Sequence, residues 1–173
     1  MQRQFILADR SRYPWIFLTL AIFANGFIFY VVPSHKSIEL LVPTTGVVAA
    51  FVYFLYAQHL QETRLFVELF QQFNERYDRL NDRLNEIVSR GQQSMLSAQD
   101  RQILFDYFNL CAEEYLYFKS GYIERQVWRS WVNGMRYYSK SVDVLHLWEE
   151  ELKSDSYYGF SLALFNEELK DRR

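Results

Sequence analysis

Two long apolar stretches near the N-terminus constrain the fold of this chain more than any other feature. Residues 15–32 read WIFLTLAIFANGFIFYVV and residues 40–58 read LLVPTTGVVAAFVYFLYAQ; neither contains a charged side chain. A helix of about 18–20 residues, at 1.5 Å per residue, is long enough to cross the hydrocarbon of a bilayer. Core helices of soluble proteins usually keep a polar face, which these stretches lack. The sequence therefore predicts a transmembrane hairpin joined by a short loop over residues 33–39.

The basic residues around the two stretches predict their orientation. Arg3, Arg10 and Arg12 precede the first stretch, only Lys36 lies in the connecting loop, and four arginines follow between residues 64 and 83. Since Lys and Arg are enriched on the cytoplasmic side of membrane proteins, both termini are expected in the cytoplasm. A cleaved signal peptide is disfavoured, because the apolar run is too long and no small-x-small cleavage site follows it. We predict a retained membrane anchor.

The composition of the remaining chain argues against several classes of protein. Residues 59–173 contain fifteen Lys or Arg against nineteen Asp or Glu, a balance that disfavours bulk nucleic-acid binding. Cys111 is the only cysteine, and with three scattered His it does not form a usual zinc motif. We predict a buried thiol, no metal and no cofactor. There is no P-loop, GxSxG or HExxH motif, nor the Arg–His spacing of HEPN nucleases, so we predict a protein that is not an enzyme.

Helical patterns continue to the end of the chain. Residues 59–91 contain neither Gly nor Pro before Gly91, which predicts one long juxtamembrane helix continuing the second stretch. Ser97 with Asp100 three residues later predicts the start of the next helix, and Gly121 its end. Further helices are expected over residues 123–139, 142–152 and 161–170. The expected fold is an all-α membrane protein with an N-terminal segment and hairpin over 1–58, a juxtamembrane helix over 59–91 and a cytoplasmic all-α domain over 92–173.

Apolar residues of the juxtamembrane helix recur with the spacing of a coiled coil. They follow intervals of four, three, four, three, four and three residues, with polar and charged residues between them. One interpretation is a coiled coil that joins several copies of the chain, and the other is a helix packed on its own domain. We favour a homo-oligomer, since aromatic side chains at the first four positions suit a wide bundle. The seam consists of Phe66, Phe70, Phe73, Tyr77, Leu80, Leu84 and Ile87.

The helix expected from residue 123 separates aromatic from basic side chains. At about 100° per residue, Arg125, Arg129, Arg136 and Lys140 fall within about 60° of one another. We favour a solvated face whose charges pair with surface carboxylates. The functional alternative is a stripe that contacts the phosphates of a nucleotide, a nucleic acid or anionic lipids.

Polar residues elsewhere are candidates for helix–helix contacts. Asn25 and Gly26 lie in the middle of the first stretch, and Gly46 lies in the second. Asn in hydrocarbon usually bonds to a neighbouring helix, and small residues allow close approach. We favour simple packing, and the alternative is a polar ring that lines a pore in an oligomer. Glu113 and Glu114 point about 100° apart, so we expect a buried carboxylate bridge rather than an acid–base pair.

Short sequence words and the order of the elements resemble a known class of bacterial proteins. The words are F-x-x-x-F-x-x-F-N-x-x-Y-D-x-L-N at 66–81, C-A-E-E-Y at 111–115, G-x-I at 121–123 and W-x-x-W-x-x-G-M at 128–135. They resemble two-span antiphage effectors: the membrane effectors encoded beside retron reverse transcriptases, and abortive-infection proteins. The resemblance implies a toxin of the bacterial inner membrane, and it carries no established site residues.

Three functions follow as expectations. The leading one is an antiphage effector that disrupts membrane integrity when triggered and is otherwise held inactive by a reverse transcriptase–RNA/DNA complex. The second is a membrane effector activated by a cyclic nucleotide, with the basic stripe as its anion contact. The third is a membrane-anchored scaffold.

Overall fold

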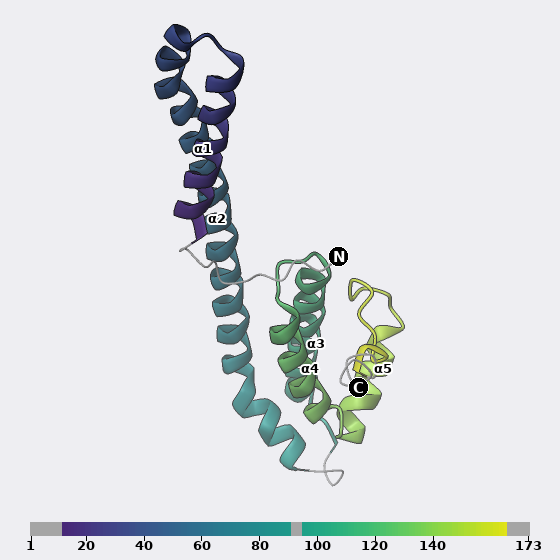
Figure 1. Ribbon diagram of the computed structural model, residues 1–173. Helices are drawn as coiled ribbons and strands as arrows, with labels where there is room; N and C mark the ends of the chain where they lie inside the picture. Colours follow the sequence, from purple (N-terminus) through teal and green to yellow (C-terminus); the bar gives the residue numbers. More distant parts are fainter. Residues whose placement is uncertain (1–11, 91–94, 166–173) are drawn as a thin grey trace. The chain divides into compact units, whose positions relative to one another are not determined.

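The chain is helical throughout the part that the structure describes. The computed structural model describes residues 12–90 and 95–165, which contain five helices and no strand. The predicted all-α fold is confirmed. The chain divides into two compact units, one within residues 5–65 and the other from Phe66 onward. Figure 1 labels the helices α1 (Arg12–Val31), α2 (Ser34–Ser89), α3 (Ala98–Lys119), α4 (Arg125–Tyr138) and α5 (Val142–Leu152).

The first unit is a helical hairpin made of α1 and the first part of α2 (Figure 1). The turn is shorter than predicted, because α2 begins at Ser34 and the expected loop over residues 33–39 is therefore mostly helix. Pro33 explains the difference: it forces the preceding residue away from helical geometry and so ends α1. Its carbonyl oxygen then accepts backbone hydrogen bonds from Lys36 (3.0 Å) and Ser37 (3.1 Å), which start the new helix.

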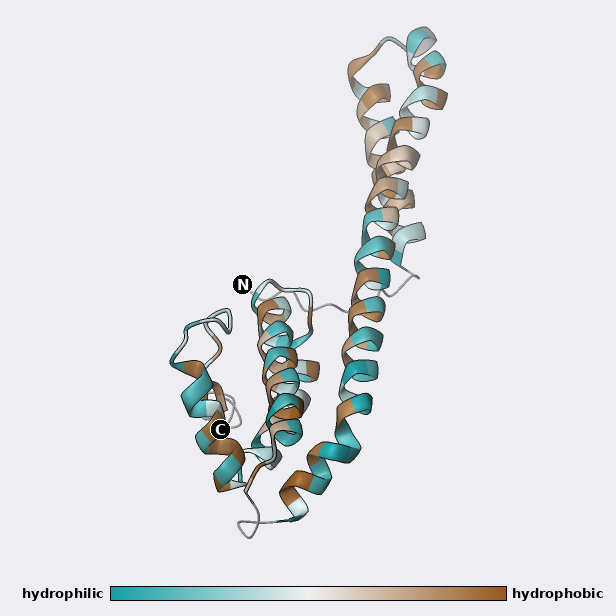
Figure 2. Ribbon diagram, turned by 180° about the vertical axis from the view of Figure 1, so that it is seen from behind, coloured by the Kyte–Doolittle hydropathy of each residue, from teal (hydrophilic) through white to brown (hydrophobic). Residues whose placement is uncertain are grey.

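A single helix continues from the hairpin into the second unit. α2 has 56 residues, and the predicted continuation of the second apolar stretch as one long helix is confirmed. Figure 2 shows its hydropathy changing along its length, from mostly apolar in the hairpin to alternating apolar and polar in the later turns. That alternation is typical of a helix with one face packed on a core.

The second unit, which we call the helical domain, packs the later part of α2 with α3, α4 and α5 around aromatic side chains. The ring of Trp148 lies between those of Phe108 (centroid distance 4.6 Å, interplanar angle 10°) and Phe160 (5.5 Å, 8°). Tyr107 and Phe165 contact the same indole at 5.8 Å. Large stacked rings supply most of the apolar area that a domain of this size can bury.

Both predicted ends of α3 are confirmed in detail. The Ser97 hydroxyl accepts a hydrogen bond from the backbone N–H of Asp100, and the Asp100 carboxylate accepts one from the backbone N–H of Ser97. This reciprocal pair is a capping box. At the other end Gly121 has a φ of +83°, and the Tyr122 N–H donates to the carbonyl of Tyr117 at 3.0 Å. These are the features of a Schellman motif, in which glycine avoids the strain of the left-handed conformation.

The other predicted helices agree closely with the structure. The helix expected over 123–139 is α4, and the one expected over 142–152 has the bounds of α5. Of the last one, expected over residues 161–170, the first half is described and is a turn that becomes helical only at residues 164–165, and the rest lies outside the described residues.

Two glycines of the helical domain should respond in opposite directions to alanine. Gly121→Ala should lower the free energy of unfolding by about 1–2 kcal/mol, because a side chain is strained at positive φ. Gly134→Ala should raise it by about 0.5–1 kcal/mol, since Gly134 lies inside α4 and an added Cβ would meet nothing within 4 Å. Urea titrations monitored by thiol labelling of Cys111, which is 1% exposed, would measure both changes. Equal effects of the two substitutions would contradict this assignment.

Candidate functional site

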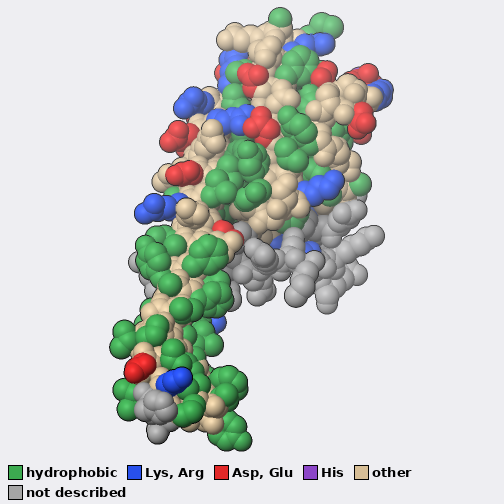
Figure 3. Space-filling model, turned by 90° about the horizontal axis from the view of Figure 1, so that it is seen from above, with side chains coloured by type: hydrophobic (Ala, Val, Ile, Leu, Met, Phe, Trp, Pro, Cys, Tyr) green, Lys and Arg blue, Asp and Glu red, His purple; other side chains and the backbone are tan. Residues whose placement is uncertain are grey.

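The hairpin exposes most of its apolar side chains. α1 and α2 each contain a segment that is long and apolar enough to cross a membrane. Almost none of either segment is buried inside the structure. A core helix of a soluble protein can be equally long and apolar, but most of its residues are buried. Figure 3 shows hydrophobic side chains dominating the hairpin, whereas charged side chains gather on the helical domain. The most exposed large side chains of α1 are Trp15 (69%), Phe23 (75%), Phe27 (68%) and Tyr30 (90%).

A polar side-chain contact joins the two hairpin helices near their middle. The Asn25 amide donates to the Thr45 hydroxyl of α2 at 3.1 Å and to the backbone carbonyl of Ala21 at 2.8 Å. Asn25 thus lies where the sequence analysis placed a helix–helix contact. Gly26 and Gly46 do not mark a close approach, because a Cβ added to either would meet nothing within 4 Å.

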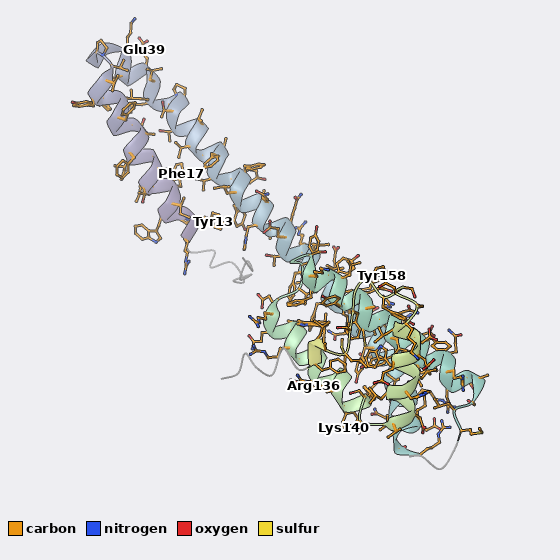
Figure 4. The ribbon with its side chains drawn as sticks, turned by 90° about the vertical axis from the view of Figure 1, so that its right-hand side faces the viewer. Tyr13, Phe17, Glu39, Arg136, Lys140 and Tyr158 are labelled. Atoms are coloured by element: carbon orange, nitrogen blue, oxygen red, sulfur yellow. The ribbon has the colours of Figure 1, made fainter. Side chains whose placement is uncertain are left out.

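Aromatic rings of α1 and α2 contact each other at the end of the hairpin opposite the turn. The ring of Tyr13 on α1 meets that of Tyr56 on α2 edge-on at 5.2 Å and lies 6.4 Å from the His59 imidazole. Figure 4 labels Tyr13 at this end of α1 and Glu39 near the turn at the other end of the hairpin. Tyrosines prefer the boundary between hydrocarbon and headgroups. The sequence analysis did not single out Tyr13 or His59, since a ring pair between two helices needs their relative placement.

The seven seam residues of α2 pack within their own chain. Phe73, Leu84 and Ile87 are buried in the core of the helical domain, and Phe66, Tyr77 and Leu80 are partly buried against it. Phe70 stacks on Trp131 of α4 at 6.2 Å. The structure thus shows the second interpretation of the heptad spacing, a helix that packs on its own domain. These contacts show how the seam packs within one chain, while Phe70 remains 37% exposed and self-association of the chain stays a prediction.

The basic stripe lies on and just after α4. Arg125 and Lys140 are exposed, Arg129 and Arg136 are half-buried, and Figure 4 labels Arg136 and Lys140 near the end of α4. The Arg136 guanidinium donates to the side-chain oxygen of Asn133 at 3.1 Å. Arg125, Arg129 and Arg136 all have interaction partners in the structure. The pairing of this face with surface carboxylates and its alternative, an anion contact, both stay predictions.

Two adjacent carboxyl groups of α3 have different environments. Glu113 binds the Arg76 guanidinium of α2 through both of its oxygens, and the two side chains are about one-third exposed. Arg–carboxylate pairs with two parallel bonds are among the stronger ionic contacts in proteins. Glu114 instead is 6% exposed, and burial raises the pKa of its carboxyl to about 8. The expected carboxylate bridge is therefore made by the more exposed of the two residues.

A fully buried carboxylate joins the start of α3 to the end of α2. The Asp100 side chain is 0% exposed and binds both Arg83 (3.0 Å) and Arg90 (3.1 Å). The Ser97 hydroxyl donates to it at 2.7 Å, and this bond, with the backbone N–H of Ser97 and the charge of Arg90, lowers the pKa of Asp100 to about 2. The sequence analysis found the cap but missed the arginines. Their spacing of seven residues puts both arginines on one face of α2, and this spacing could have predicted that they share a partner.

A hydroxyl–amide cluster forms another contact between α2 and α4. The Tyr77 and Tyr138 hydroxyls lie 2.9 Å apart, and both are within 3.0 Å of the Asn81 side-chain oxygen. Asn85 also donates to that oxygen at 3.0 Å. Because each partly buried polar group has a partner, this cluster fixes the register of the two helices rather than leaving a reactive group.

The described residues contain no group of three or more His, Cys, Asp or Glu that could hold a metal ion. No protein-family model, no curated protein and no solved structure matches this chain.

Proposed function

We propose that this chain is a membrane-inserted antiphage effector of the bacterial inner membrane, whose triggered form disrupts membrane integrity. The hairpin lies in the bilayer, both termini face the cytoplasm, and the helical domain acts from the cytoplasmic side. The observation that carries membrane insertion is the exposure of apolar side chains around both hairpin helices, which water would penalise at about 25 cal/mol per Å². The effector role and its control by a reverse transcriptase complex are supported by the resemblance in layout and sequence words alone.

A membrane-anchored scaffold is the second candidate, and one contact favours it. The Asn25 amide donates hydrogen bonds inside the hairpin, to the Thr45 hydroxyl and to the Ala21 carbonyl of its own helix. Its N–H groups are therefore not directed into a water-filled pore. An anchor needs only such internal packing, whereas a pore needs polar groups that face water. The two functions differ in one measurable property, the permeability of the membrane.

The experiment uses the full chain in anionic vesicles loaded with a self-quenching dye. A membrane-disrupting effector releases the dye in proportion to the inserted protein, and a scaffold inserts without release. The same comparison in bacterial cells uses induced expression and a membrane-impermeant DNA dye. The reverse transcriptase complex that would restrain the effector is absent from both systems, so the free chain is the active form, and efficient insertion with no dye movement in either would reject the effector and leave the scaffold.

Asn25→Leu tests whether the polar contact of the hairpin matters for permeability. The substitution removes the bond to Thr45, which is worth about 0.6–1.7 kcal/mol in a bilayer, so we expect unchanged insertion and an altered rate of dye release. Thr19→Val is the matched control, because the Thr19 hydroxyl donates only to the Trp15 carbonyl of its own helix. Identical release by the wild type and the Asn25 variant would exclude this contact from the permeability step.

A further inference from the structure

Glu114 places a carboxyl group in the buried part of the helical domain, where the charge of Arg76 only partly offsets the cost of burying an ionised form. It is 6% exposed and lies on the buried face of α3 with Tyr107 and Cys111, which are 3% and 1% exposed. Helical spacing puts Cys111 one turn before Glu114 and Tyr107 two turns before it. Among the residues that the structure describes, its carboxyl group takes part in none of the hydrogen bonds or ion pairs that hold α3 in place. A buried carboxylate without such bonds is strongly disfavoured relative to the neutral acid.

The nearest cation is already engaged. Arg76 of α2 is bound through two nitrogens to Glu113, the neighbour of Glu114 in sequence. The charged and titratable groups that act on this cluster are Arg76 and Tyr77 from α2, and Glu113, Cys111 and Tyr107 from α3. From α4, Tyr138 contacts the ring of Tyr107 at 5.3 Å. One guanidinium thus faces two adjacent carboxyl groups, and only one of them can hold it with two bonds.

We propose that Glu114 is a proton-binding site that makes the contact between α2 and α3 sensitive to pH. In the protonated form, Glu114 packs as a neutral side chain and Arg76 stays on Glu113. Loss of the proton places a second negative charge in the core, where it repels Glu113 and competes for Arg76. The α2–α3 contact then loosens, and the domain changes state without any other ligand.

The direction of the effect follows from proton linkage. Burial raises the pKa of Glu114 from its usual 4.5 to about 8, with a further contribution from the charge of Glu113, while Arg76 acts in the opposite direction. Between these two values the folded domain binds one proton more than the unfolded chain does. Its stability is therefore complete below about pH 4.5 and is lost as the pH rises through 8. At the pH of the bacterial cytoplasm, a small alkaline change alters the occupancy of this site.

The test compares full-length wild type with Glu114→Gln in lipid nanodiscs, using two readouts. Infrared spectroscopy of the wild type at pH 6.5 should show the carbonyl band of a protonated carboxyl group, which disappears as the pH rises to 9. Glu114→Gln should lack the band. Hydrogen exchange of α2 and α3 amides, corrected for intrinsic rates, should lose protection in the wild type by up to tenfold per pH unit. The variant should keep its protection over the same range.

Glu113→Gln serves as the matched control on the neighbouring carboxyl group. It should keep the infrared band but move its disappearance to lower pH, because one repelling charge is removed and Arg76 is released to face Glu114. A wild type without the band at pH 6.5 would overturn the proposal. The same pH profile of exchange in the wild type and in Glu114→Gln would also overturn it, since a purely structural glutamate leaves no such difference.

Discussion

Asp100→Ala should lower the free energy of unfolding of the helical domain by about 2–3 kcal/mol. The substitution removes the Asp100 half of the capping box of α3, its bond to the Ser97 N–H, and the only carboxylate that joins Arg83 and Arg90 to α3 in the described residues. Breaking a buried ion pair usually costs 3–5 kcal/mol, but both arginines are about one-third exposed and can turn to water, which reduces the cost. The urea midpoint of Cys111 labelling measures the change, because this thiol is buried until the domain opens.

Asp106→Ala is the matched control on the same helix. Asp106 is exposed and accepts one hydrogen bond, from the Gln102 amide, so its loss should change the stability by less than about 0.5 kcal/mol. Equal effects at positions 100 and 106 would show that the buried carboxylate does not hold α2 and α3 together.

Acid should reproduce part of the Asp100 effect. The pKa of this carboxyl group is lowered from 3.8 to about 2, so its contribution is present above about pH 4 and is lost as the pH falls toward 2. Glu114 has the opposite dependence, because its pKa is raised. Asp100 and Glu114 thus make opposite contributions to the pH dependence of the domain's stability.

Trp148→Ala should have the largest effect of any single substitution considered, a loss of about 3–5 kcal/mol. The indole is 0% exposed, is stacked between Phe108 and Phe160, and touches two further rings. Removing it leaves a cavity that rigid aromatic neighbours fill poorly. Since small domains are stable by only about 5–15 kcal/mol, Cys111 of the variant should label faster without denaturant and at a clearly lower urea midpoint than in the wild type.

Trp148→Phe distinguishes packing from hydrogen bonding at this position. The indole N–H of Trp148 has no acceptor in the part of the chain that the structure describes, so phenylalanine loses contact area but no hydrogen bond. We expect about half of the alanine effect or less. A phenylalanine variant as unstable as the alanine variant would contradict the stacking account.

Local features of the fold were predictable from the sequence, because their causes are local. The Ser97–Asp100 capping box depends on residues three apart, and Gly121 ends α3 through its own φ angle. The apolar stretches likewise predict helices by composition alone. The predicted loop over residues 33–39 was wrong, since its polar residues are compatible with the first turns of a helix and only Pro33 interrupts the chain.

The contacts between helices were less predictable, because the same apolar spacing is compatible with several different packing partners. The heptad spacing from Phe66 to Ile87 establishes an apolar face of α2 but does not specify what covers it, and the structure covers it with α3 and α4. In the same way, Glu113 and Glu114 are adjacent in the sequence, and only the placement of α2 decides which of them binds Arg76. Arg83 and Arg90 needed the position of Asp100 before they could be assigned to it.

Extraction of cell membranes tests the central proposal, insertion of the hairpin, most directly. Cells that express the full chain are lysed, and the membrane pellet is washed with high salt and then with alkaline carbonate. If α1 and the first part of α2 lie in the bilayer, the chain stays in the pellet through both washes and is released only by detergent. Recovery of the intact, folded chain in the detergent-free supernatant would contradict insertion and the function proposed from it.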